Sequence, residues 1–199
     1  MSRTGEVLLD RSELRELARR LAAEISADHP DGVDLVGVLN GCLCFLPDLC
    51  RMLSVPCRVD FLALSAFGGA TTRVRVVKDL DLDVSGASVV LVEDIVDTGL
   101  SARYVTGLLA ARGAASVDVC TLLDRPGRRI VPLPLRYVGV VAPDDFLVGY
   151  GLDFAGRYRN LPALHRADVA RLETDLGTLG PLFGLPGGRE EGARPAARD

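Results

Sequence analysis

The sequence of 199 residues has no excess of positive charge: 23 lysines and arginines stand against 27 aspartates and glutamates, a net charge of −4. Proteins that bind nucleic acid usually present a basic face, so this balance argues against a nucleic-acid partner. No apolar run reaches the length of a membrane span, and the N-terminal segment is amphipathic and charged, unlike a signal peptide. We therefore expect a soluble, cytoplasmic protein with no membrane partner.

Several familiar sites are also missing. The sequence contains neither GxxxxGK[ST] nor GxGxxG, which excludes two common phosphate-binding loops. Its cysteines lack the CxxC spacing of a zinc site, and neither histidine is placed to complete one. They are expected to be buried thiols in a reducing compartment: Cys42, Cys44, Cys50, Cys57 and Cys120.

The residues that are present suit one globular domain. Hydrophobic residues make up 48% of the chain and charged residues 25%, which is enough apolar material for a full core. Residues 1–179 are predicted to form a single domain. The tail at 180–199 is rich in glycine, proline and charge and is predicted to be disordered.

Hydrophobic periodicity predicts an α/β fold with a mainly parallel sheet flanked by helices. Fully apolar stretches are typical of buried parallel strands, and the strand–loop–helix–strand order at 88–123 requires a right-handed crossover. Helices are predicted at 11–25 with Ser12 as N-cap, at 43–53, after residue 101 as far as Gly113, and at 166–176. Strands are predicted at 33–39, 57–64, 73–77, 88–92, 117–123, 135–141 and 146–148, with a flexible loop at 65–72.

The loop predicted at 93–101 has an unusual composition. It contains Glu93, Asp94 and Asp97, and then Thr98, Gly99, Leu100 and Ser101 at the start of a helix. Exposed N–H groups and the helix dipole suit a phosphate, whereas carboxylates suit sugar hydroxyls or a hydrated Mg²⁺. Alternatively, Asp97 or Thr98 caps the helix and the acidic pair forms a solvated turn. Clustered like charges without a ligand are costly, so we favour a ligand with a phosphate and a polyol.

Residues 89–99 (VVLVEDIVDTG) resemble the phosphoribosyl pyrophosphate (PRPP) signature of type I phosphoribosyltransferases. The wider chain, over about residues 10–165, resembles the hypoxanthine-guanine phosphoribosyltransferases. The resemblance rests on residues 36–41 (VGVLNG), 121–124 (TLLD), 146–153 (FLVGYGLD) and 158–161 (YRNL). It implies a parallel sheet with a small hood, and transfer of ribose 5-phosphate from PRPP to a purine-like base with Mg²⁺.

The resemblance also implies residue roles. Glu93 and Asp94 would take the ribose hydroxyls and, with Asp153, the metal. Asp97 would accept a proton from the base, and residues 98–101 would wrap the 5′-phosphate. Pyrophosphate would meet Leu39, Asn40, Gly41 and Arg159; the purine would meet Arg125, Phe146, Leu147 and Asp153; Ala66 and Phe67 would belong to a lid loop. Taken singly, Phe146 could be core, Asp153 a turn cap and Arg159 a surface ion-pair partner.

Some positions depart from the family pattern, all near the expected substrates. Asn40 replaces a lysine, Ala66 and Phe67 replace a serine–tyrosine pair, Arg125 replaces a lysine, and Asp145 reverses a charge. Three hypotheses stay open: a drifted 6-oxopurine enzyme, an enzyme for a modified base such as a 7-deazapurine, and a non-catalytic PRPP-sensing regulator. The family suggests a homodimer or homotetramer.

Overall fold

The computed structural model of the chain describes residues 5–67 and 73–174. The predicted tail at 180–199 and most of the predicted 65–72 loop therefore lie outside the described residues. No helix in the described part of the chain is long and apolar enough to cross a membrane.

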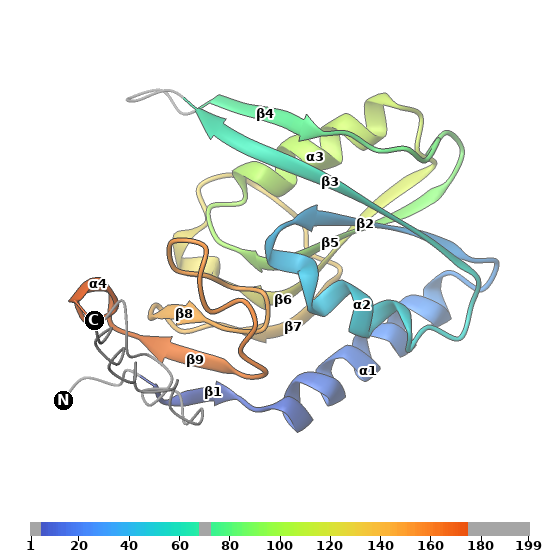
Figure 1. Cartoon of the computed structure of the whole chain (residues 1–199). Helices are drawn as coiled ribbons and strands as arrows, with labels where there is room; N and C mark the ends of the chain where they lie inside the picture. The colour runs from blue at the N-terminus through green and yellow to red at the C-terminus, as the bar shows by residue number, and fades with distance from the viewer. Residues whose placement is uncertain (1–4, 68–72, 175–199) are drawn as a thin grey trace, which may run out of the picture.

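A six-stranded sheet with the order β4-β3-β2-β5-β6-β7 forms the centre of the fold (Figure 1). All neighbouring strands pair in parallel except β3 and β4, which are antiparallel. The predicted α/β class with a mainly parallel sheet flanked by helices is confirmed. The strands of this sheet are β2 (Val33–Leu39), β3 (Cys57–Phe67), β4 (Arg73–Lys78), β5 (Ser88–Val96), β6 (Ser116–Asp124) and β7 (Tyr137–Val141).

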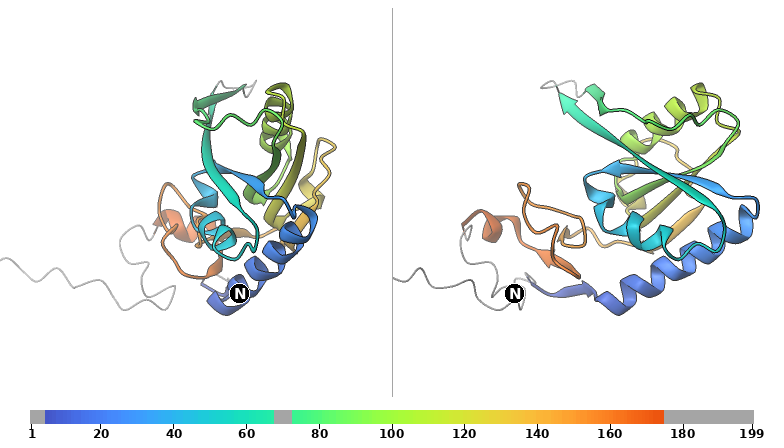
Figure 2. Two further views of the ribbon diagram at one scale, coloured as in Figure 1. Left: turned by 90° about the vertical axis from the view of Figure 1, so that its right-hand side faces the viewer. Right: turned by 45° about the vertical axis from the view of Figure 1, so that its right-hand side comes forward.

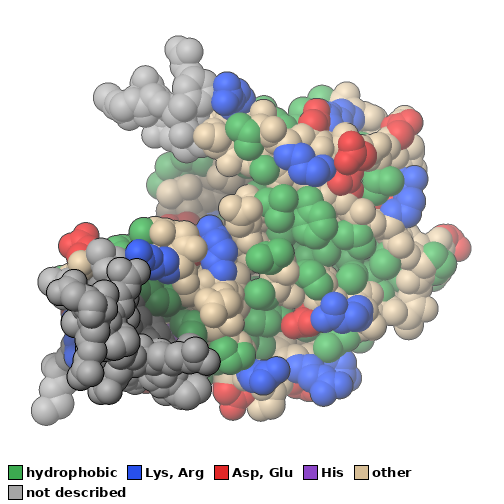
Figure 3. Space-filling model, viewed as in Figure 1, with side chains coloured by type: hydrophobic (Ala, Val, Ile, Leu, Met, Phe, Trp, Pro, Cys, Tyr) green, Lys and Arg blue, Asp and Glu red, His purple; other side chains and the backbone are tan. Residues whose placement is uncertain are grey.

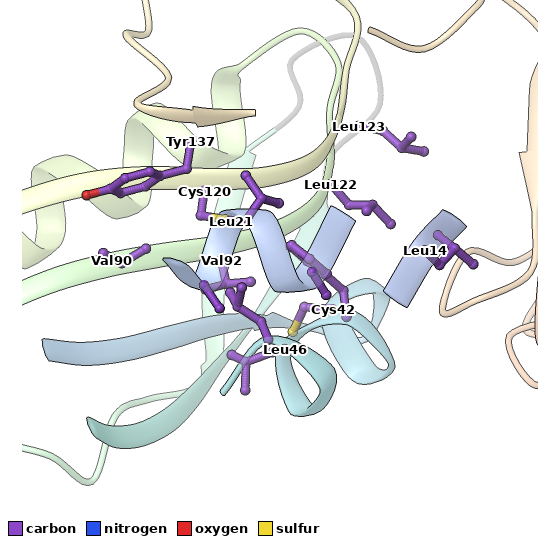
Figure 4. Packing of buried hydrophobic residues seen from close by; sticks show 14 of the residues in the cluster. Leu14, Leu21, Cys42, Leu46, Val90, Val92, Cys120, Leu122, Leu123 and Tyr137 are labelled. Carbon is purple, nitrogen blue, oxygen red and sulfur yellow. The ribbon is translucent and has the colours of Figure 1, made fainter. Parts of the chain in front are cut away.

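Helices cover both faces of this sheet because its central strands are apolar on both sides. On one face, α1 (Arg11–Asp28), the short 3₁₀ turn η1 (Gly41–Leu43) and α2 (Phe45–Cys50) pack on β2, β5 and β6. Figure 4 shows side chains from these elements meeting in the core. On the other face, α3 (Leu100–Ala111) packs against β2, β5 and β6 through Ala102, Val105 and Leu109.

A second, three-stranded sheet lies to one side of the first and has the order β1-β9-β8 (Figure 2). Its strands are β1 (Val7–Leu9), β8 (Phe146–Val148) and β9 (Leu164–Ala167), all antiparallel to their neighbours. Both ends of the described chain meet here, since β1 pairs with β9. We call this sheet, the connection at 149–163 and α4 (Val169–Thr174) the hood.

Several predicted boundaries were wrong. Asp10, not Ser12, caps α1, because its carboxylate accepts from the Ser12 and Glu13 N–H groups while the Glu13 side chain accepts from the Asp10 N–H. The helix predicted at 43–53 is reduced to η1 and α2. The helix predicted at 166–176 begins only at Val169, since residues 164–167 pair with β8 as a strand.

The prediction of buried thiols holds only in part. Cys42 and Cys120 are buried, Cys44 and Cys50 are half-buried, and Cys57 is exposed at the start of β3. Burial raises the pKa of the Cys42 thiol to about 12, so this side chain behaves as an apolar core residue.

Candidate active site

A cleft of about 290 Å³ lies at the carboxyl ends of β2 and β5, where ligands bind in open parallel sheets. A larger cavity of about 960 Å³ lies between α1, α2 and residues 150–162, but it contains none of the predicted site residues. We assign the chemistry to the smaller cleft because carboxylates and a helix start converge on it. Its lining includes Leu39, Glu93, Asp94, Asp97, Thr98, Gly99 and Ser101.

The acidic pair belongs to strand β5 rather than to a loop, which corrects the predicted start of the loop at 93. Glu93 pairs with Thr121 of β6, and the ladder continues to Val96 opposite Asp124. Burial, and then the neighbouring Asp94 charge, raise the pKa of Glu93 well above its usual range. Burial also raises the pKa of Asp94 to about 6. Both carboxylates are thus held where a cation or hydroxyl donor would stabilise their charged forms.

Gly41 brings the end of β2 against this pair. A Cβ at Gly41 would overlap the Asp94 carboxylate, and a Cβ at Gly151 would overlap the Gly41 carbonyl oxygen. The Gly151 backbone has φ +104°, a conformation that glycine adopts without steric cost. These contacts bring the hood backbone, the end of β2 and the acidic pair together.

The loop that links β5 to α3 is only three residues long, from Asp97 to Gly99. Gly99 has φ +84°, which turns the chain into the helix. Among the described residues, neither the Thr98 nor the Gly99 N–H group has a hydrogen-bond partner, while Leu100 N–H donates to Thr98 Oγ1 at 3.4 Å. Free N–H groups at a helix start form an anion-binding site.

Asp97 is the first residue of this loop, and its carboxylate does not use all of its hydrogen-bond acceptors. Its Oδ1 is buried and has no hydrogen-bond partner within the described residues, while Oδ2 accepts from Arg128 Nη1 at 3.4 Å. The alternative role of Asp97 as a helix cap is wrong, since the helix N-cap is Gly99. An unpaired buried carboxylate oxygen is poised to accept a proton or a hydrogen bond from a ligand.

On the hood side, Arg125 and Asp145 form one connected group. The Arg125 guanidinium donates to the carbonyl of Pro143 at 3.2 Å and to the carbonyl of Asp145, and burial lowers the pKa of Arg125. The Asp145 carboxylate forms an ion pair with Arg166 of β9. Asp145 therefore has a protein partner for its charge, although the family pattern has a cation there.

The two residues after Asp145 begin β8. Phe146 is 38% exposed and contacts Phe154 edge-on, with ring centroids 5.9 Å apart. Leu147 is buried and faces Arg166 across the ladder. An exposed aromatic face beside a buried strand residue is available for stacking.

Asp153 and Arg159 face each other across the hood connection, with Arg159 Nη2 2.7 Å from Asp153 Oδ1. Asp153 also accepts from the Gly156 N–H, and Arg159 donates to the Gly151 carbonyl at 2.6 Å. Both residues act electrostatically on Asp94. The fold therefore brings these two predicted residues to the acidic pair from 59 or more positions away in the sequence.

Other predicted residues are placed less favourably. Leu100 is 47% exposed and does not line the cleft, and Asn40 is exposed. Ala66 and Phe67 belong to strand β3, where they pair with Val74 and Arg73, so their prediction as loop residues was wrong. Pairing with β4 continues the antiparallel hairpin beyond the predicted strand end. Residues 68–72 of the predicted lid lie outside the described residues.

The family model of the phosphoribosyl transferase domain matches residues 6–155. This chain belongs to the phosphoribosyltransferase family. It is 43% identical over 168 residues to the hypoxanthine phosphoribosyltransferase of Salmonella typhimurium, covering 81% of this chain and 94% of that protein. It is 39% identical over 161 residues to the hypoxanthine-guanine phosphoribosyltransferase of Bacillus subtilis, covering 79% and 89%.

Solved phosphoribosyltransferase structures share this fold. A hypoxanthine phosphoribosyltransferase of Trypanosoma cruzi matches with a TM-score of 0.82 at 31% identity, over 89% of this chain and 98% of that chain. A hypoxanthine-guanine phosphoribosyltransferase of Bacillus anthracis matches with a TM-score of 0.79 at 35% identity, over 82% and 98%. The resemblance stated from the sequence motifs is confirmed.

The donor atoms of this phosphoribosyltransferase fit a hard cation. Glu93, which is buried, and Asp94, which is half-buried, offer carboxylate oxygens, the type of ligand that Mg²⁺ prefers. Within the described ranges, no three potential ligands form a metal-binding group, so Glu93, Asp94 and Asp153 do not make a cage by themselves. Mg²⁺ commonly binds through one or two carboxylates together with substrate phosphates, and this site suits that mode.

Sequence reasoning missed two arginines of this phosphoribosyltransferase, Arg128 and Arg129. They follow Arg125 in a turn that includes the 3₁₀ helix η2 (Pro126–Arg128) after β6. The signal was available, because this turn leaves the carboxyl end of the strand next to β5 and carries three arginines.

Proposed function

We propose that this chain transfers ribose 5-phosphate from PRPP to a 6-oxopurine base, giving a nucleoside monophosphate and pyrophosphate. The observation that carries this proposal is the cleft at the end of β5, where the buried Glu93 and the half-buried Asp94 adjoin a helix start whose N–H groups lack partners among the described residues. That combination suits a ligand with a polyol and a phosphate. The relatives named hypoxanthine phosphoribosyltransferases support the same base class.

In this proposal Thr98, Gly99, Leu100 and Ser101 hold the 5′-phosphate, and Glu93 and Asp94 accept hydrogen bonds from the ribose hydroxyls. Glu93, Asp94 and Asp153 would hold Mg²⁺, which would supply charge neutralisation for the pyrophosphate. Leu39, Asn40 and Gly41 line the pyrophosphate position with backbone groups, and Arg159 provides the cation there. Arg159 is held beside Asp153, with its Nη2 2.7 Å from Asp153 Oδ1.

Asp97 would accept the proton that the base loses. As pyrophosphate leaves, positive charge develops on the ribose, and the base must lose a proton if the purine ring of the product is to be neutral. The buried Oδ1 of Asp97 is free to accept that proton, while Arg128 orients Oδ2. Phe146 would stack on the base, with the Leu147 backbone reading its edge and Arg125 and Asp153 completing the pocket.

The second candidate function is transfer to a modified base such as a 7-deazapurine, which the departures from the family pattern suggested: Asn40, Ala66, Phe67, Arg125 and Asp145. Asp145 forms an ion pair with Arg166 of β9, so its negative charge already has a partner within the protein. The charge reversal at this position therefore does not require a different base. We therefore favour the 6-oxopurine. A PRPP-sensing regulator would bind PRPP in the same cleft without turnover.

A pyrophosphate-release assay separates these functions. The full chain is mixed with PRPP, Mg²⁺ and one base at a time: hypoxanthine, guanine, xanthine, adenine or a 7-deazapurine. Turnover with hypoxanthine or guanine is expected. Turnover restricted to the 7-deazapurine would support the second candidate, and PRPP binding without release for any base would support the regulator. Omission of Mg²⁺ is expected to abolish release.

We also propose that the chain forms a homodimer or homotetramer. Hydrophobic side chains gather on the face over α2 and β3 in Figure 3, where Leu43 is 52% and Val59 is 39% exposed. The study of the Trypanosoma cruzi relative concerns the role of its C-terminal region in its oligomeric state. Light scattering of the full chain at several concentrations tests this proposal, and a monomer at all of them would reject it.

A further inference from the structure

The turn that follows β6 braces the loop at Asp97–Gly99 from behind. Arg125 N–H donates to the Val96 carbonyl at 3.0 Å, and Ile130 N–H donates to the Thr98 carbonyl at 3.1 Å. The segment at 125–130 thus runs alongside the loop and bonds to it at both ends. Neither bond involves a substrate-facing group.

Arg129 fills the centre of this brace. Its Nε donates to the Asp97 carbonyl at 3.1 Å, and its Nη2 approaches the Val96 carbonyl at 3.4 Å and pairs with the Asp124 carboxylate. The Arg129 and Asp124 side chains are only 15% and 16% exposed. A partly buried guanidinium with an anionic partner and a planar fork is held in one orientation.

Arg129 also occupies the space behind Gly99. A Cβ at Gly99 would lie 2.7 Å from Arg129 Cδ, which leaves no room for a side chain on that side. The aliphatic stem of Arg129 therefore packs directly on the loop backbone while its head bonds to the carbonyls. The loop cannot relax toward β6 while this side chain is in place.

The geometry of the peptide unit links these bonds at the loop carbonyls to the direction of the loop N–H groups. In a trans peptide the carbonyl and the following N–H point in opposite directions. Because Arg129 holds the Asp97 carbonyl on the β6 side, the Thr98 N–H points away from that side. The bond from Ile130 to the Thr98 carbonyl does the same for the Gly99 N–H. These are the two N–H groups that lack a partner among the described residues.

We infer that Arg129 is a positioning residue for PRPP: held by Asp124, it aims the Thr98 N–H group at the 5′-phosphate without touching the substrate, while the Ile130 N–H does the same for Gly99. This inference rests on the proposed function. Its neighbour Arg128 differs in kind, since Arg128 contacts the Asp97 side chain rather than the loop backbone. Substitution of Arg129 should therefore weaken phosphate binding, whereas substitution of Arg128 should alter proton transfer.

The test uses the full chain with Arg129→Met, which keeps an unbranched stem and removes the guanidinium. We expect KM for PRPP to rise about tenfold, the effect of losing one charge-assisted hydrogen bond. The Kd of ribose 5-phosphate, measured by calorimetry, should rise by a similar factor. KM for hypoxanthine should change by less than about twofold, because no base contact is removed.

Three further variants separate positioning from general loss of structure. Arg129→Lys keeps the charge beside Asp124 and should recover part of the PRPP affinity. Asp124→Asn leaves the bond from Arg129 to the Asp97 carbonyl and should have a smaller effect, about threefold. Arg136→Met is the control, because it removes an ion pair with Asp28 that does not involve the loop at Asp97–Gly99. It should leave KM for PRPP, KM for hypoxanthine and the Kd of ribose 5-phosphate unchanged.

The outcomes decide between the inference and the proposed function. Unchanged KM for PRPP and unchanged ribose 5-phosphate affinity in Arg129→Met would overturn the inference, and so would an equal loss for hypoxanthine and PRPP. A wild-type chain that binds no ribose 5-phosphate would also overturn it. If the wild type binds ribose 5-phosphate, fails to turn over hypoxanthine, and loses that binding in Arg129→Met, the inference stands and the 6-oxopurine function fails.

Discussion

The two halves of the candidate site are built differently. The phosphate side, which comprises Glu93, Asp94 and the loop at residues 97–101, is the end of a buried core strand and the start of a helix. The base side, which comprises Arg125, Asp145, Phe146 and Leu147, spans the junction between the central sheet and the hood. The first half rests on the ladder between β5 and β6 and on the Arg129 side chain, which bonds to the Asp97 carbonyl. The second rests on the ladder between β8 and β9, the bonds of Arg125 to the hood and the ion pair of Asp145 with Arg166.

This difference accounts for the two departures from the family pattern on the base side, at Arg125 and Asp145. A half that depends on backbone direction and strand register tolerates little change, and its motif stands intact at residues 93–99. On the base side, charged side chains can exchange one set of partners for another. Asp145 illustrates this, since its reversed charge is matched by Arg166. Changes on the base side should therefore alter the use of the base while PRPP binding is preserved.

The largest expected effect is on the phosphate side, at Asp97. Asp97→Asn removes the proposed proton acceptor but keeps the size of the side chain and a group that can contact Arg128. We expect kcat to fall by about 10²–10⁴, the usual contribution of general base catalysis, with little change in KM for PRPP. Steady-state pyrophosphate release measures both constants. An unchanged kcat would reassign Asp97 to loop structure.

The next effect is on the base side, at the ion pair between Asp145 and Arg166. Arg166→Met removes the partner that holds Asp145 on β9, so the start of β8 loses its anchor beside Phe146. KM for hypoxanthine should rise about tenfold, and KM for PRPP should stay within about twofold.

A double-substitution cycle with Asp145→Asn is the control for this ion pair. If the pair acts as a unit, the double variant is no worse than the worse single variant. Additive losses would show that the two residues act separately, and an equal loss for PRPP would remove the distinction between the two halves.

A smaller effect is expected at Arg125, which joins the central sheet to the hood. Arg125→Lys cannot donate to both the Pro143 and Asp145 carbonyls, because lysine lacks the planar fork. Losing one such bond should lower kcat/KM for hypoxanthine about fivefold. The test measures kcat/KM for hypoxanthine and for a 7-deazapurine in the wild type and in Arg125→Lys. Improved use of hypoxanthine by the variant would instead show that the arginine had altered the base preference.

Most of the central fold could be predicted from the sequence because apolar runs and helical periodicity report directly on burial. The exceptions have local causes. Strand β5 extends past its apolar run through Glu93 and Asp94, since pairing with β6 continues at residues that face a cleft rather than the core. The last two residues of β9 fall inside the helix predicted at 166–176, because the pairing of β9 with β1 and β8 is long-range and no local pattern shows it.

The site was predictable to a different extent in each half. Residues of one short motif lie together because they follow one strand, so the sequence places Glu93 to Ser101 by itself. Only the family resemblance linked Asp153 and Arg159 to Asp94. The hood approaches the acidic pair where the backbones of Gly151 and Gly41 come close together, and no local sequence pattern shows this approach. Arg129 was missed because it acts on carbonyl groups, which a sequence does not show.

The smallest effect concerns how the hood is anchored to the central domain, at Tyr150. Its hydroxyl donates to Asp48 of α2 at 2.6 Å, while Asp48 keeps a second partner in Arg51. Tyr150→Phe removes only this bond and should lower the free energy of unfolding by about 1 kcal/mol, since Asp48 stays paired. Urea denaturation measures it, with Arg19→Met, which removes an exposed ion pair within α1, as the control. Because Tyr150 adjoins Gly151, a rise in KM for PRPP without lost stability would instead place this bond in the positioning of the acidic pair.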